Sequence, residues 1–148
     1  MTDRQLPRDL MRAVSLGDEE RGQQIEEQLD GNQREFYAML ASAMFAAALE
    51  VRFGDDTSME AVKQYCDEFS YDYRDLNPPI KSLEVEGLIR GMMGEEKYFS
   101  EIDPVDQLRI GVLSIRKIVA QSPQMQSQLD SYLGDAELLV DSWLVDGA

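Results

Sequence analysis

One stretch of the chain constrains its fold more than any other. The 14 residues from Phe36 to Leu49 contain a single polar side chain, Ser42, and are built largely of alanine. Alanine is the strongest helix former, whereas a membrane-spanning helix needs about 20 more strongly apolar residues. The pattern therefore predicts a helix over 32–53 that is apolar nearly all round. Such a helix is surrounded either by other helices of its own chain or by a partner subunit.

Side chains that can cap a helix precede most of the other apolar segments. The spacing of Thr57 with Glu60, and of Asn32 with Glu35, is that of a capping box. Further start signals are Asn77-Pro78, Asp103-Pro104 and Ser122-Pro123, and the pairs Gly17-Asp18 and Gly134-Asp135 combine a stop with a start. These signals predict helices near 7–16, 18–30, 32–53, 57–70, 78–90, 103–121 and 135–145, with a possible short helix at 123–133.

The fold class follows from this organisation. Threonine occurs only twice and β-branched alternation is nearly absent, which argues against an extensive sheet. We therefore predict a single all-α domain over 1–148, a bundle of six to eight helices around the helix at 32–53. The helix at 103–121 is predicted to pack on it through one apolar stripe. The members of that stripe are Val105, Leu108, Val112, Ile115 and Val119, and Ile110, Leu113 and Ile118 widen it.

The chemistry that the chain lacks limits its functions. It has no histidine and one cysteine, Cys66, so Ser-His and Cys-His nucleophiles and nearly all zinc sites are excluded. No phosphate-binding glycine loop, dinucleotide fingerprint or calcium loop is present, and we predict neither a cofactor nor a metal. Cys66 lies in the apolar stripe of its helix beside Asp67, which favours a buried, unreactive thiol.

The formal charge of -15 points to the kind of partner that the chain would attract. A field of this sign repels nucleic acid and anionic membranes and favours basic proteins. Two helices carry acidic stripes, which are either solvated faces or docking surfaces. The two tyrosines that follow the second stripe either mark a recognition surface or close the end of the bundle. The candidate partner-binding residues are Glu19, Glu20, Glu26, Glu27, Asp30, Glu60, Asp67, Glu68, Asp75, Tyr71 and Tyr73.

The segment 57–102 allows a second interpretation. Two helices followed by 88–102 have the cadence of a winged helix, in which 88–102 is either a β-wing or the end of a helix with a loop. A DNA-binding winged helix needs basic residues at positions where this segment has few. A degenerate winged helix here would therefore belong to a transcription regulator that does not itself bind DNA. We favour the helix with a loop.

The N-terminal residues 1–17 form a candidate docking arm, with leucines on one face and Arg4, Arg8 and Arg12 outside it. Docking on the chain's own acidic body is the simplest expectation. No signal sequence is evident, and we expect a soluble, cytoplasmic protein, either monomeric or a homodimer. The leading hypothesis is a non-enzymatic adaptor, regulator or inhibitor of a basic protein. The alternatives are a transcription regulator, and a small-molecule binder or an enzyme that relies on carboxylates.

Overall fold

The computed structural model describes residues 3–146 and is all-helical, with no strand among them. This confirms the predicted fold class. The helices are α1 (Gln5–Ser15), α2 (Glu19–Glu26), α3 (Gly31–Phe53), α4 (Met59–Asp72), α5 (Ser82–Met92), the 3₁₀ helix η1 (Glu96–Glu101), α6 (Pro104–Gln121), α7 (Pro123–Ser127) and α8 (Leu129–Asp146).

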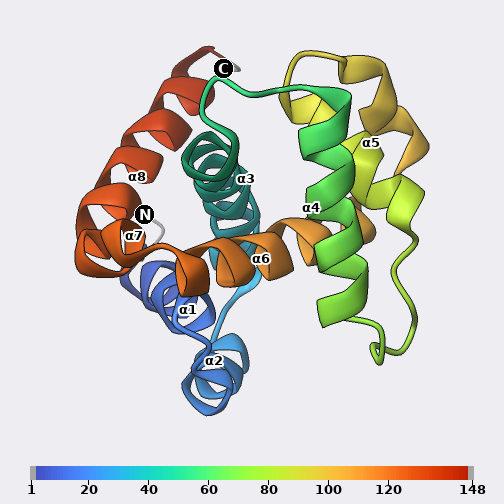
Figure 1. Cartoon of the computed structure of the whole chain (residues 1–148). Coiled ribbons are helices and arrows are strands. Elements are labelled where there is room, and N and C mark those ends of the chain that lie inside the picture. Colours follow the sequence, from blue (N-terminus) through green and yellow to red (C-terminus); the bar gives the residue numbers. More distant parts are fainter. Residues whose placement is uncertain (1–2, 147–148) are drawn as a thin grey trace.

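The predicted helix at 32–53 is α3, and it occupies the centre of the molecule (Figure 1). Helices α1, α6 and α8 pack against it. The side chains of Leu40, Met44 and Ala48 are fully buried, and Phe36 and Phe45 are nearly so. Burying a leucine or methionine stabilises the fold by about 1.5–3 kcal/mol, so α3 organises the largest share of the core.

The same helix is long and apolar enough to span a membrane by length and composition. Half of its most apolar window is buried by neighbouring helices, which is the packing of a core helix in a helical bundle. Its near-uniform apolar character therefore has an explanation within the fold.

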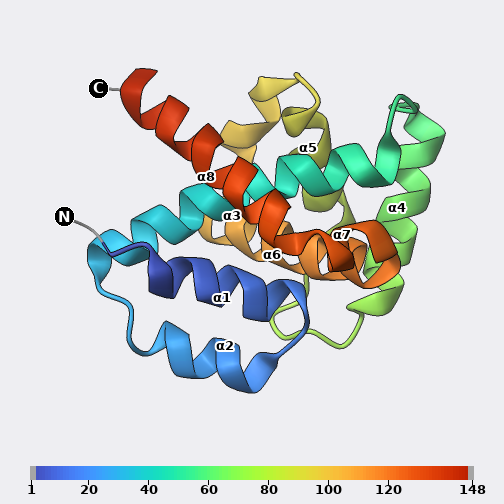
Figure 2. The same ribbon diagram turned by 90° about the vertical axis from the view of Figure 1, so that its left-hand side faces the viewer.

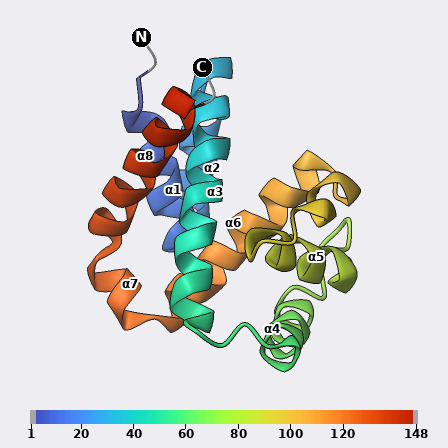
Figure 3. The same ribbon diagram turned by 90° about the horizontal axis from the view of Figure 1, so that it is seen from above.

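Helices α4, α5 and η1 lie on one side of α3, and α1 and α8 lie on the other (Figure 3). Tyr65 and Phe69 of α4 are buried toward α3, where Tyr65 meets Phe53 edge-on with ring centres 5.7 Å apart. Gly91 of α5 lies so close to Phe99 of η1 that a Cβ atom would approach the ring within 2.7 Å. The absence of a side chain at Gly91 thus lets η1 fold back onto α5.

The described part of the N-terminal arm, residues 3–17, docks on its own chain (Figure 2). This is the simplest of the arrangements expected from the sequence. Helix α1 packs on α2, α3 and α6, while its outward arginines meet α8. Arg4 lies 2.8 Å from Asp141, Arg8 lies 3.3 Å from Glu137, and Arg12 pairs with Asp130. The basic segment is therefore matched to the acidic face of the last helix.

Both predicted capping boxes are misplaced, one by a single residue and the other by two. Helix α3 is capped by Asp30, whose carboxylate accepts from the Gln33 N–H at 2.8 Å, while the Gln33 side chain accepts from the Asp30 N–H at 2.9 Å. Helix α4 is capped by Ser58, whose hydroxyl accepts from the Ala61 N–H. In each case a neighbouring side chain satisfies the same unpaired backbone donors as the predicted cap would.

Two predicted helix starts also fail. Helix α5 begins at Ser82 rather than Pro78, because Pro79 disfavours helical backbone at the residue before it. Gly134 does not stop a helix, since α8 runs through it without a break. A glycine inside a helix costs about 1 kcal/mol, which the burial of Leu133 and Ala136 on either side offsets.

The stripe predicted for α6 is only half right. Ile115 and Val119 are buried against the core, as expected, but Val105 is 75% exposed and Leu108 and Val112 are only half-buried. The packed face is formed by Ile110 and Ile118, which widen the predicted stripe, with Gly111, Ser114 and Ile115. Helix α6 therefore has two apolar faces, one buried in the core and one that its own chain covers only in part.

Candidate functional site

Adjacent basic residues of α6 connect the two acidic stripes predicted from the sequence. Arg116 lies 2.8 Å from Glu19 of α2, whereas Lys117 pairs with Asp72 of α4 and lies 3.5 Å from Glu68. Successive residues of a helix point about 100° apart, so α6 can bind a carboxylate on each side. The stripes are consequently anchored on two different sides of one helix, about 100° apart.

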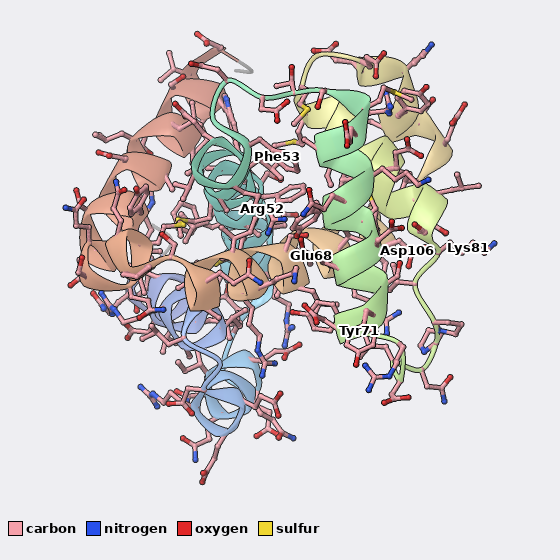
Figure 4. The ribbon with its side chains drawn as sticks, viewed as in Figure 1. Arg52, Phe53, Glu68, Tyr71, Lys81 and Asp106 are labelled. Atoms are coloured by element: carbon pink, nitrogen blue, oxygen red, sulfur yellow. The ribbon has the colours of Figure 1, made fainter. Side chains whose placement is uncertain are left out.

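The α4 side of this arrangement is a compact ionic cluster of Arg52, Glu68, Asp72 and Lys117. Arg52 reaches from α3 toward α4, where it forms a forked pair with Glu68 at 2.7 and 3.2 Å (Figure 4). The side chain of Lys117 is only 3% exposed. Hydrogen bonds from Arg52 hold the pKa of Glu68 below its usual value. A lysine this buried requires paired carboxylates, so the cluster has a structural role in holding α4 to α3 and α6.

Two buried hydroxyls stand beside this cluster. The Tyr65 and Ser114 side-chain oxygens are inaccessible and have no hydrogen-bond partner at normal geometry among the described residues. Burial raises the pKa of Tyr65, and proximity to Ser114 only partly opposes that rise. The phenol is therefore neutral at physiological pH.

Several of the eleven candidate residues already have partners in their own chain. Glu19 and Glu68 form the ion pairs above, Glu26 lies 4.0 Å from Arg34, and Asp30 is the cap of α3. These four carboxylates stabilise the fold, which the sequence pattern could not show because most partners lie far away in the chain. The remaining acidic candidates are exposed and have no ion pair within residues 3–146. They are Glu20, Glu27, Glu60, Asp67 and Asp75.

The two candidate tyrosines differ. Tyr73 is half-buried, donates from its hydroxyl to the Leu113 carbonyl at 3.1 Å and packs edge-on against Phe69. Tyr71 is 66% exposed near the end of α4, with the Arg74 guanidinium over its ring (Figure 4). Only Tyr71 is therefore placed to meet a partner. Cys66 is buried, and that burial raises its pKa to about 12, so its thiol is unreactive at neutral pH.

A feature that the sequence analysis missed is a groove between α2 and α6, with α1 and the start of α3 as its floor. Its volume is about 630 Å³, and apolar side chains form most of its wall. Helix α2 packs on α1 but not closely on α6, which leaves the second apolar face of α6 open. The signal was present in the sequence as the unusually wide apolar surface of 103–121.

No group of three or more potential metal ligands comes together within residues 3–146. The alternatives for 88–102 are also resolved, since the segment is the end of α5, a turn and η1, and not a β-wing. The winged-helix hypothesis thus has no wing in the structure to support it.

Comparison of the chain with known proteins found no matching family model, no matching curated sequence and no matching solved structure.

Proposed function

We propose that the protein is an acidic interaction protein that binds a basic protein partner, as an adaptor, regulator or inhibitor. The observation that carries the proposal is the set of exposed carboxylates on or next to α2 and α4 that have no cation at ion-pair distance within residues 3–146. They comprise Glu20, Glu27, Glu60, Asp67 and Asp75, which we call the open carboxylates.

Charge balance supports this proposal. The chain has 29 acidic against 14 basic residues, and many of the arginines are already engaged within the fold. Excess negative charge on an exposed helical surface accelerates association with a basic partner and makes the complex sensitive to salt. Tyr71 beside Asp75 adds an exposed aromatic ring, a residue type enriched at binding hot spots.

The test compares two variants of equal charge. The first changes the open carboxylates to Gln or Asn, and the second changes Glu35, Glu50, Glu96, Glu101 and Asp135, which are exposed elsewhere, in the same way. Each variant loses five negative charges. Tagged wild type and both variants are used to capture proteins from a cell lysate at low and high salt, and the captured proteins are identified by mass spectrometry.

The proposal predicts a basic protein that the wild type and the second variant retain at low salt, that high salt releases, and that the first variant fails to capture. Equal capture by both variants would show that net charge and not the open carboxylates determines binding. Empty capture by the wild type at both salts would contradict the proposed function itself.

A further inference from the structure

The groove between α2 and α6 has the shape of a binding site for a small elongated molecule. Its volume of about 630 Å³ lies within the range of about 300–1,000 Å³ that is typical of small-ligand pockets. Helix α2 forms an ion pair near each of its ends. Glu19 pairs with Arg116 of α6, and Glu26 pairs with Arg34 of α3. Between these ties, α2 and α6 stand apart with their side chains lining the gap.

Apolar side chains form most of the wall of the groove. Three carboxylates also line it: Asp18 caps α2, Glu19 pairs with Arg116, and Glu26 lies near Arg34. Leu10 and Val14 of α1 form the floor, and Leu108 and Val112 of α6 form one side. Val105, at the same face of α6, is 75% exposed. Covering such aliphatic surface is favourable by about 25 cal/mol per Å², so an alkyl chain is the group that this wall selects.

One cation in the groove lacks a counter-ion. Arg109 lines the wall and is half-buried, and it has no carboxylate within ion-pair distance among the described residues. The other basic residues without such a partner are all exposed: Arg21, Lys63, Arg74, Lys81 and Lys97. A guanidinium removed from water gains most from an anion that can accept two of its N–H groups, and a carboxylate does so.

We propose that the groove binds an amphiphilic monocarboxylate, a fatty acid of medium chain length, with its carboxylate on Arg109 and its alkyl chain along Leu108 and Val112. The overall charge of -15 restricts the head group further, because a multiply charged phosphate or nucleotide would meet stronger repulsion than a single carboxylate. This inference is independent of the partner-binding proposal, since the open carboxylates do not line the groove.

The first experiment is isothermal titration calorimetry of the full chain with three probes that share a ten-carbon tail: decanoate, 1-decanol and decyltrimethylammonium. The proposal predicts saturable 1:1 binding of decanoate, at least tenfold tighter than that of the other two probes. Absence of saturable decanoate binding would overturn the proposal. Equal affinity for decanol would overturn the assignment of Arg109, and preference for the cation would overturn the choice of an anionic ligand.

Variants locate the site. Arg109→Gln is expected to weaken decanoate binding about tenfold, while the matched control Arg74→Gln, an exposed arginine outside the groove, should bind as the wild type does. Val112→Trp fills the groove and should abolish binding while the far-ultraviolet circular dichroism stays unchanged. Unaltered decanoate affinity in Arg109→Gln would contradict the proposal even if Val112→Trp failed to fold.

Light scattering across a range of protein concentrations tests whether a second copy of the chain, and not a small ligand, covers the groove. The proposal predicts the same oligomeric state for the wild type and Val112→Trp. A dimer of the wild type that Val112→Trp disrupts would show that a second copy of the chain covers the groove, and would overturn the ligand assignment.

Discussion

The two apolar faces of α6 differ in how far the rest of the chain covers them. One face, with Ile110, Ile115 and Ile118, is buried against α3 and the surrounding core, and the other, with Val105, Leu108 and Val112, lines the groove beside α2. Both faces are aliphatic and follow helical spacing, so residue type alone does not separate them. An apolar stripe in the sequence shows which side chains of a helix can be buried. The helices packed around it determine how many of those side chains are buried in the folded chain.

The largest effect is expected from the packed face. Ile115 is fully buried, and its truncation to alanine removes aliphatic groups and leaves a cavity that the close-packed core fills only in part. We expect Ile115→Ala to lower the free energy of unfolding by about 2–5 kcal/mol. Urea denaturation measures this, and a loss below about 1 kcal/mol would mean that the packed face is assigned wrongly.

A second contrast lies in the neighbouring cations. Lys117 is buried between Glu68 and Asp72, whereas Arg116 forms an exposed pair with Glu19. We expect Lys117→Ala to cost about 2–3 kcal/mol, less than a fully buried pair because both carboxylates reach solvent. Arg116→Ala should cost less than about 1 kcal/mol. Similar losses in the two variants, measured by urea denaturation, would remove this distinction between the two sides of α6.

The ionic cluster also predicts a dependence on pH. Because Arg52 lowers the pKa of Glu68 in the folded state, this carboxylate contributes stability above its usual pKa of 4.5 and loses that contribution as the pH falls through the lowered value. The stability difference between wild type and Glu68→Gln should therefore be constant near neutral pH and shrink in acid. Denaturation of both proteins at several pH values measures it, and a difference that grows in acid would contradict the ion pair.

A small stabilisation is expected at Gly111 on the packed face. A Cβ atom there would lie 3.7 Å from the Phe45 ring, which is ordinary van der Waals contact. Gly111→Ala should therefore raise the free energy of unfolding by up to about 1 kcal/mol through helix propensity. Thermal unfolding measures the gain, and a marked loss would show that the packed face is tighter than the structure has it.

Local features of the sequence predicted much of this fold. The stretch from Phe36 to Leu49 identified the central helix, and Pro104 marked the start of α6. The start of α5 was missed because Asn77-Pro78 has the form of a capping signal, whereas Pro79 disfavours helical backbone at Pro78. Local patterns place helices along the chain, yet they do not orient them.

The candidate site was less predictable, because it depends on contacts between distant residues. Glu19 and Arg116 are 97 positions apart, so no local pattern shows that this carboxylate already has a partner. The groove likewise arises from the spacing of α2 and α6, although the wide apolar surface of 103–121 hinted at it. The sequence therefore supplied the candidate side chains, and the fold separated the engaged ones from the open ones.

That α6 has one face packed in the fold and one face left open is tested most directly by three aliphatic residues of that helix. Ile118 on the packed face is 2% exposed, Val112 is half-buried at the groove, and Val105 is 75% exposed. Each is changed to alanine, and the free energy of unfolding is measured in urea. We expect losses of about 2–5 kcal/mol for Ile118→Ala, less than about 1 kcal/mol for Val112→Ala and nearly none for Val105→Ala. A loss for Val112→Ala as large as that for Ile118→Ala would show that the groove face belongs to the core.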